Sequence, residues 1–165
     1  MGVEAVTAGA ATVIALGSLY VSIVQSRLSM RHNKQSVRPL LQQRQIRDRV
    51  AHRAGIELIN AGLGPAIVTR TLVYLDGEHI GQWTRPTFER VLRQTPEDPE
   101  DVEKYALPGG VVLLSGQSVF LLRLTPFDRD RHAGFGDLVL RRLRIEIHYE
   151  SLYGGEDFVS ASPPI

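Results

Sequence analysis

The sequence contains no cysteine, and this absence excludes several kinds of site. A chain without thiols has no disulfide bonds, no thiol nucleophile and no cysteine-ligated zinc. Its five histidines never occur with H-x-H, H-x-x-x-H or H-E-x-x-H spacing, and the G-x-S-x-G nucleophile elbow is missing. We therefore expect no metal site, no cofactor and no catalytic residue, and we expect that the chain is not an enzyme.

Charged residues are missing from one long stretch near the amino terminus, between Glu4 and Arg27. A helix from Ala5 to Ser26 would be about 33 Å long, enough to cross the hydrocarbon core of a bilayer. A cleaved signal peptide would carry basic residues before this stretch and a small-x-small site after it, and both are missing. The stretch predicts a retained transmembrane helix. The alternatives are a cleaved signal and a helix of a soluble protein.

Basic residues follow the apolar stretch instead of preceding it. From Ser26 to Arg53 the net charge is +7, whereas from Ala54 onward it is −5. Basic residues close to a membrane stay on the cytoplasmic side, so we expect a single-pass protein of the inner (cytoplasmic) membrane with its amino terminus outside and its carboxyl-terminal domain in the cytoplasm. The candidate lipid headgroup contacts are Arg27, Arg31, Lys34 and Arg38. The alternative is that these charges only set the topology. We expect no nucleic-acid partner.

Small residues recur along the apolar stretch at alternating steps of three and four. They are Ala8, Ala11, Ala15, Ser18 and Ser22. Small residues let helices approach closely in lipid, so this seam predicts a homo-oligomer formed through the transmembrane helix. The alternative is a chance pattern in a segment rich in alanine and serine.

Past Pro39 the pattern changes from helical to short extended runs, which sets two domains at residues 1–36 and 37–165. Seven or eight runs have the composition of strands, and Asp76-Gly77 between two of them is a strong hairpin signal. One or two helical turns are expected from Pro86. The fold class is mainly β: an amino-terminal transmembrane α-helix followed by an antiparallel immunoglobulin-like β-sandwich, with a small β-barrel as the alternative. The expected strands are LLQQRQI, AGIELIN, AIVTRTLVYL, DGEHIGQW, two runs around Ser115-Gly116 in VVLLSGQSVFLLRL, RLRIEIHYE and GGEDFVSA.

Three segments carry a resemblance to a known group: HNKQSVRPLL, LINAGLGPAIVTRTLVYLDG and IHYESLYGGEDF. With the apolar helix before them, they resemble a group of short, largely uncharacterised bacterial membrane proteins. In that group a single amino-terminal transmembrane helix precedes an immunoglobulin-like β domain. The resemblance implies a fold and a location, and it implies no reaction.

Four residues are candidate interaction residues. Trp83 and Arg85 lie where a strand ends, and aromatic residues and arginine dominate binding hot spots; a tryptophan of the core is the alternative. Phe127 and Phe135 flank DRDRHAG, where they either close one end of the β domain or line a pocket. In NAGLGPA we expect a structural turn, because Asn60 and Gly62 tolerate positive φ and Gly64 permits a tight approach; a ligand-contacting loop is the alternative. We expect His148 on a solvated strand face.

These observations favour a membrane-anchored, non-catalytic interaction or ligand-sensing module with a cytosolic β domain. Its expected partners are membrane lipid, further copies of itself, and a protein or small-molecule ligand that the sequence does not identify. One alternative is a membrane-disrupting effector of an antiphage defence system, gated by its β domain. The other is an enzyme with a site that no motif reveals.

Overall fold

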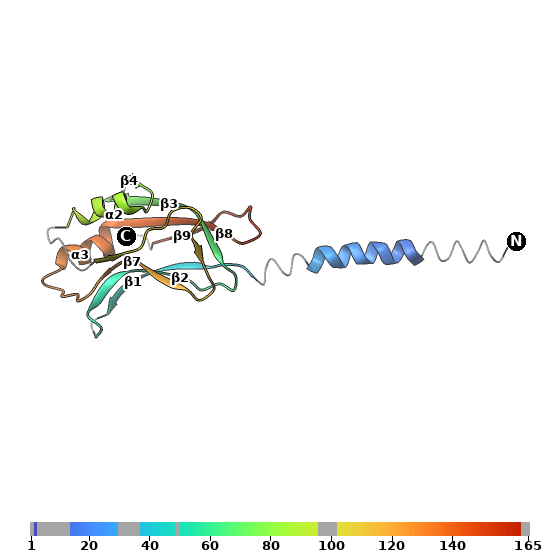
Figure 1. The fold of residues 1–165 in the computed structure, drawn as a ribbon, viewed down its shortest axis with the longest axis horizontal. Coiled ribbons are helices and arrows are strands. Elements are labelled where there is room, and N and C mark those ends of the chain that lie inside the picture. The colour runs from blue at the N-terminus through green and yellow to red at the C-terminus, as the bar shows by residue number, and fades with distance from the viewer. Residues whose placement is uncertain (1, 3–13, 30–36, 49, 96–101, 163–165) are drawn as a thin grey trace. The chain divides into compact units, whose positions relative to one another are not determined.

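The computed structural model describes residues 2, 14–29, 37–48, 50–95 and 102–162. The chain divides into two units, Met1–Ser36 and Val37–Ile165. In the first unit, residues 14–29 form a helix, called here the N-terminal helix. The second unit, called here the β domain, is made mainly of antiparallel strands (Figure 1). Each unit is described by itself.

The β domain contains nine described strands, two short helices and one π-helical turn. In chain order they are β1 (Leu41–Asp48), β2 (Arg53–Asn60), β3 (Ala66–Leu75), β4 (Glu78–Gly81), α2 (Arg85–Leu92), β5 (Val102–Lys104), β6 (Val112–Leu113), β7 (Ser118–Leu124), α3 (Ala133–Asp137), η1 (Leu138–Arg142), β8 (Leu143–Glu150) and β9 (Phe158–Ala161). The predicted strands and the helical turns from Pro86 are confirmed, because each lies on one of these elements.

The strands form two sheets, and every described pairing is antiparallel. One sheet has the order β1-β2-β7-β5; the other has the order β4-β3-β8-β9, with β6 pairing beside β3. The chain passes from one sheet to the other five times: between β2 and β3, between β4 and β5, between β5 and β6, between β6 and β7, and between β7 and β8. Immunoglobulin-like sandwiches likewise contain two antiparallel sheets that face each other. The strand order is consistent with that expectation.

The β3–β4 hairpin confirms its sequence signal. Asp76 and Gly77 both have positive φ, at 52° and 85°, and Leu75 pairs with Glu78. This geometry is the two-residue turn that matches strand twist. Arg142 in η1 closes the corner, because its Nε and Nη2 donate to the two carboxylate oxygens of Asp76 at 2.8 and 2.6 Å. The pKa of Asp76 is lowered by this hydrogen bond.

The turn around Ser115-Gly116 joins two strands of different sheets. Strand β6 pairs with β3, whereas β7 pairs with β2 and β5. Gly116 has a φ of 75°, as a tight turn requires. The segment before β6 also bridges the sheets, since the Tyr105 amide donates to the Leu121 carbonyl and the Leu107 amide to the Trp83 carbonyl.

On the opposite side, glutamine side chains link β1 to the second sheet. The Gln43 Nε2 donates to the carbonyls of Ile145 at 3.0 Å and Ser160 at 2.9 Å. The Gln45 Nε2 donates to the Val139 carbonyl at 3.0 Å. Side-chain amides therefore satisfy backbone carbonyls along this edge, where no strand of the other sheet pairs with β1.

The core lies between the two sheets. The strands contribute alternating inward side chains, and Ile56, Leu58, Val68, Ile145 and Ile147 are fully buried or nearly so. Asn60 continues the inward face of β2 past Leu58 and is also fully buried. A buried carboxamide costs free energy unless all of its hydrogen bonds are made.

Asn60 makes four side-chain hydrogen bonds that join three segments. Its Oδ1 accepts from the amides of Leu40 at 3.2 Å and Gly62 at 3.0 Å. Its Nδ2 donates to the carbonyls of Gly64 at 2.8 Å and Leu113 at 3.0 Å. The carboxamide therefore holds the segment before β1, the loop after β2 and the end of β6 together.

The glycines of NAGLGPA allow these segments to pack closely. A Cβ at Gly64 would overlap the Val37 carbonyl, and a Cβ at Gly62 would overlap the Leu40 amide. The structural role predicted for this segment fits these contacts, and the tight approach predicted at Gly64 is confirmed. Neither Asn60 nor Gly62 has positive φ. Gly62 and Gly64 must lack a side chain because another backbone segment lies against each of them.

We predict that Asn60→Ala lowers the free energy of unfolding by about 3 kcal/mol, because it leaves buried backbone groups without partners. Urea unfolding followed through Trp83, the single tryptophan, measures this change. Gln117→Ala is the matched control, since its Oε1 accepts from the exposed Leu114 amide and its loss should cost under about 0.5 kcal/mol. Equal unfolding midpoints for the two variants would contradict the role of Asn60.

Candidate functional site

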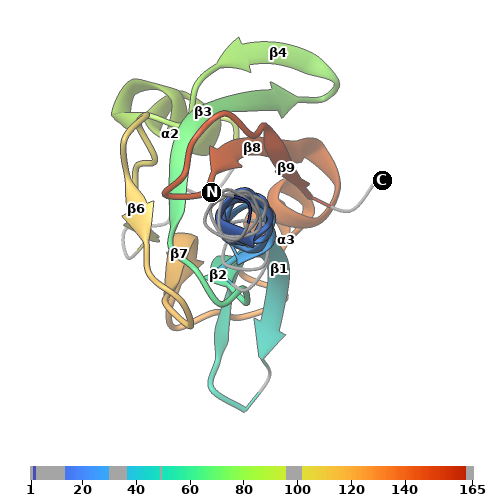
Figure 2. The ribbon, with the colours of Figure 1, turned by 90° about the vertical axis from the view of Figure 1, so that its right-hand side faces the viewer.

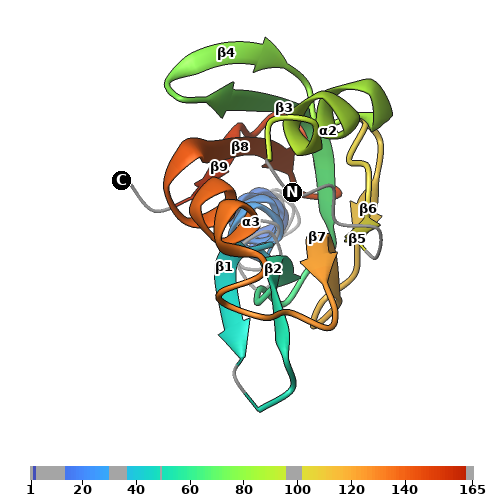
Figure 3. The ribbon, with the colours of Figure 1, turned by 90° about the vertical axis from the view of Figure 1, so that its left-hand side faces the viewer.

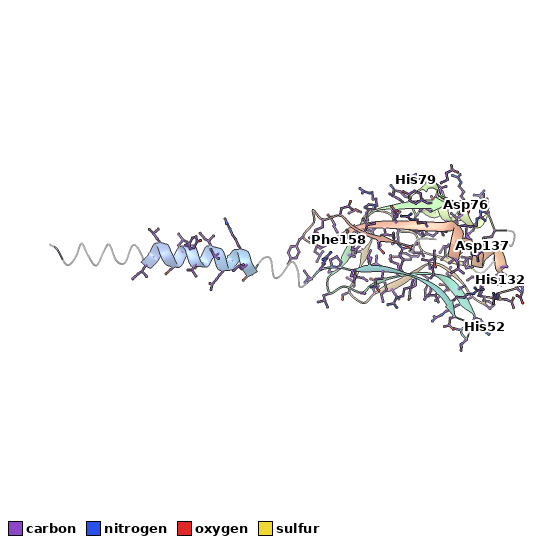
Figure 4. All side chains as sticks on the ribbon, turned by 180° about the vertical axis from the view of Figure 1, so that it is seen from behind. His52, Asp76, His79, His132, Asp137 and Phe158 are labelled. Carbon is purple, nitrogen blue, oxygen red and sulfur yellow. The ribbon has the colours of Figure 1, made fainter. Side chains whose placement is uncertain are left out.

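The loops of the β domain gather at two ends. One end, called here the distal end, contains the β1–β2 turn and the connection from β7 through α3 to β8 (Figure 3). Figure 4 shows His52 and His132 at this end and Phe158 at the other. The distal end has a cavity of about 280 Å³, called here the distal cavity. Its lining residues are Arg47, Asp48, His52, Phe127, Asp128 and Arg129.

Phe127 provides the apolar surface of the distal cavity. Its side chain is 7% exposed, and its amide donates to the His52 carbonyl at 2.5 Å. This bond ties the β7–α3 connection to the β1–β2 turn, where His52 has a φ of 45°. A small void beneath Phe127 reaches Ile46 and Val139. The interpretation of Phe127 as a pocket-lining residue fits its position.

Two aspartates shape the loops that border the distal cavity. The Asp48 Oδ1 accepts from the amides of Val50 and Ala51, both at 2.9 Å. The Asp128 Oδ1 accepts from the amides two and three residues ahead, at 2.9 and 2.8 Å. These backbone hydrogen bonds lower the pKa of both carboxyl groups, so both are ionised at neutral pH. In both aspartates it is Oδ1 that accepts these turn amides.

The distal cavity is also lined by two arginines, Arg47 and Arg129. The Arg47 guanidinium carbon lies 5.7 Å from the centre of the Phe127 ring. Within the described ranges, neither Arg47 nor Arg129 forms an ion pair, although Arg53 nearby pairs with Asp48 at 3.4 Å. The cavity therefore offers two guanidinium groups beside an aromatic surface. A carboxylate or phosphate with an attached apolar group has matching chemistry.

Trp83 lies in the core, so its interpretation as a core tryptophan holds and its interpretation as a surface contact does not. Its side chain is 0% exposed, its Nε1 donates to the Tyr105 carbonyl at 2.9 Å, and its amide donates to the Thr71 Oγ1 at 2.7 Å. Its ring lies 5.9 Å from that of Phe88 in α2. The indole closes the sandwich beneath this helix, as the alternative prediction stated.

The other two candidate interaction residues lie apart from the distal cavity. Arg85 is on the surface of α2, where its Nε donates to the Glu89 Oε1 at 2.9 Å. Phe135 is fully buried in α3 and packs in the core. The structure therefore brings only Phe127, of the four, to a cavity.

His148 is buried, which corrects the expectation of a solvated strand face. Its Nδ1 lies 2.8 Å from Asp157 Oδ1 and 3.0 Å from Arg70 Nη2. Because Nδ1 either donates to the carboxylate or accepts from the guanidinium, it satisfies one of these contacts at a time. The pKa of Asp157 is lowered, first by its hydrogen bond with His148 and then by Arg70. The loop before β9 covers this side chain.

The residues predicted to contact lipid or other helices are only partly described. Ala15, Ser18, Ser22 and Arg27 lie on the N-terminal helix, where all described side chains are exposed. Arg38 lies in the β domain, with its guanidinium carbon 4.8 Å from the centre of the Phe158 ring. Ala8, Ala11, Arg31 and Lys34 lie outside the described residues. In the described part of the chain, no helix combines the length and apolar character that crossing a membrane requires.

Sequence reasoning missed His52, Arg47 and Arg129. These residues come from three separate positions on a turn, a strand end and a loop, and no fixed spacing relates them. Only the pairing of β1 with β2 and the bond from Phe127 to His52 bring them together. In the part of the chain that the structure describes, no three His, Asp or Glu side chains form a group able to hold a metal ion.

The chain was compared with protein-family models, with curated proteins and with solved structures. None of the three comparisons finds a match.

Proposed function

We propose that this protein is a membrane-anchored, non-catalytic interaction module, with a cytosolic β domain that senses a ligand at its distal end. The observation that supports the anchor most strongly is the exposure of the N-terminal helix. Ile14, Leu16, Leu19, Val21 and Ile23 are all exposed, although they occupy several faces of one helix. A helix that exposes large apolar side chains over much of its circumference needs a surrounding apolar medium, and lipid is such a medium.

Charge supports the proposed orientation. No charged residue occurs between Glu4 and Arg27, whereas basic residues follow at once. Under the positive-inside tendency, the β domain then lies in the cytoplasm, at the inner membrane. Arg27, Arg31, Lys34 and Arg38 are the proposed headgroup contacts, and the small-residue seam is the proposed contact between copies.

The proposed ligand carries an anionic group joined to an apolar or aromatic group. Arg47 and Arg129 supply positive charge without an ion-pair partner among the described residues, and Phe127 supplies the apolar surface. The aspartates of the cavity are held by backbone amides, so they do not neutralise the arginines by direct contact. Small-molecule sites combine an apolar wall with a few placed polar groups in this way.

We predict that the full-length protein is retained in the membrane fraction after washes with high salt and with alkaline carbonate, and is released by detergent. The physical reason is that salt screens headgroup contacts but does not remove an apolar helix from lipid. Immunoblotting of the fractions measures the retention. The matched control is the β domain alone, residues 37–165, which should appear in the soluble fraction. Release of the full-length protein by salt would contradict the anchor.

We predict that phenyl phosphate binds the distal cavity, whereas phenol, which lacks the charge, does not. Backbone amide shifts in nuclear magnetic resonance spectra of the β domain should move at His52, Phe127 and Arg129. Arg129→Gln should weaken binding by about fivefold, since one charge-assisted hydrogen bond is lost.

Arg85→Gln is the control for this titration, because Arg85 is an exposed arginine already paired with Glu89 on α2. It should leave the affinity for phenyl phosphate unchanged. Equal shifts with phenol, or equal loss of affinity in the two variants, would contradict an anion-binding distal cavity.

A further inference from the structure

The end of the β domain opposite the distal cavity has its own surface, called here the loop end. It consists of the leading segment at residues 37–40, the β2–β3 loop at 61–65, the β6–β7 loop at 114–117 and the β8–β9 loop at 151–157. Figure 2 views the β domain from this side. Hydrogen bonds link the first three of these segments: the Leu63 amide donates to the Arg38 carbonyl, and the Ser115 Oγ donates to the Gly62 carbonyl. The β8–β9 loop follows β8, whose Tyr149 Oη accepts from the Leu41 amide at the start of β1.

The loop end carries a concentration of exposed large hydrophobic side chains. Leu63 is 76% exposed, Leu114 is 62% exposed and Leu152 is 65% exposed, each in a different loop. Leu40 and Tyr153 add to the same end. Elsewhere on the described β domain, exposed large hydrophobic residues are scattered singly, as at Val50 in the β1–β2 turn and Leu140 in η1. A grouped set of this kind marks a contact surface.

These leucines are held outward by loops with fixed backbones. Leu63 stands between Gly62 and Gly64, both tied to the Asn60 carboxamide. The Ser115 Oγ donates to the Gly62 carbonyl at 2.6 Å, which links the loops of Leu63 and Leu114. The β2–β3 and β6–β7 tips are therefore positioned as one unit.

The covalent chain identifies the surface that the loop end can reach. Ser29 is the last described residue of the N-terminal helix, and Val37 begins the β domain. Eight peptide steps span at most about 28 Å, so Val37, the first residue of the loop end, stays within that distance of Ser29. The same stretch contains Arg31 and Lys34, which favour an anionic bilayer surface.

The acidic side chains in and next to the β8–β9 loop all have partners within the β domain, and Asp157 pairs with Arg70 and His148. The Glu150 Oε2 accepts from the Gly155 amide at 3.0 Å. The Glu156 Oε2 accepts from the Ser151 hydroxyl at 2.8 Å and from its amide at 3.2 Å. Leucine and tyrosine, with Leu152 and Tyr153 adjacent in this loop, are suited to the boundary between headgroups and acyl chains.

We propose that the loop end is a lipid-contacting surface: Leu63, Leu114 and Leu152 insert into the interface of the bilayer, and the β domain stands on the membrane with its distal cavity facing the cytosol. This proposal rests on the proposed membrane anchor. The loop end adds a second contact with the membrane, beside the N-terminal helix, and this contact fixes the orientation of the β domain. Without it, the β domain would reorient freely.

The test uses the full-length chain, whose lack of cysteine allows single labels. Leu63→Cys, Leu152→Cys, Val50→Cys and Tyr20→Cys are each labelled with the fluorophore NBD and reconstituted into phosphatidylcholine–phosphatidylglycerol vesicles that contain brominated lipid. Val50 is the matched control, since it is 92% exposed in a loop of the distal end. Tyr20 reports on the anchor. Emission of Trp83 checks that each variant is folded.

We expect brominated lipid to quench labels at positions 20, 63 and 152 at least about twice as strongly as the label at position 50.

Several outcomes would overturn this proposal. If position 20 is quenched and positions 63 and 152 do not differ from position 50, the proposal is overturned and the anchor stays in place. Blue-shifted emission at position 63 without lipid quenching overturns it in favour of a protein contact. Quenching at positions 63 and 152 but not at position 20 supports the lipid contact and contradicts the anchor. No quenching at any position contradicts both.

Discussion

The buried carboxamide of Asn60 is the interaction on which the arrangement of the β domain most depends. It lies at the end of the inward face of β2, where a nonpolar side chain would pack but would leave several backbone groups without partners. Its four hydrogen bonds join the segment that leads into β1, the β2–β3 loop and the end of β6. The backbone of Asn60 adds two more, with the Gln117 carbonyl and the Gly116 amide. The loop end is therefore built as one body, from which Leu63 and Leu114 project.

The sequence patterns predicted most of the strands because each pattern is local. The alternation of apolar and polar residues in AGIELIN and RLRIEIHYE indicates which side chains face a core, and Asp76-Gly77 indicates a turn. Both can be recognised from the local sequence alone. The partners of a strand are not local. Strands β6 and β7 are neighbours along the chain and lie in different sheets, because β6 pairs with β3 and β7 with β2. His148 was misplaced for a similar reason: the loop that buries it, carrying Asp157, follows the strand by several residues.

The candidate site was less predictable than the fold. Phe127 was a candidate because it flanks DRDRHAG, with two interpretations: it closes one end of the β domain or it lines a pocket. Its interpretation as a pocket residue did not extend to Arg47 or His52, which precede it by more than seventy positions and reach it only through the β1–β2 hairpin. For Trp83 the sequence left two interpretations open. A tryptophan at a strand end fits a binding surface and a capped core equally well, and only the contacts with Thr71, Phe88 and Tyr105 place it in the core.

The central claim of the proposed function is that the β domain lies on the cytosolic side of the membrane in which the N-terminal helix is anchored. Labelling of Val50→Cys by a membrane-impermeant maleimide, in intact cells and after lysis, tests it most directly. Val50 is highly exposed at the distal end, so the folded domain does not shield it. The account predicts no labelling in intact cells and full labelling after lysis. Labelling of intact cells would place the domain outside the membrane and contradict the account.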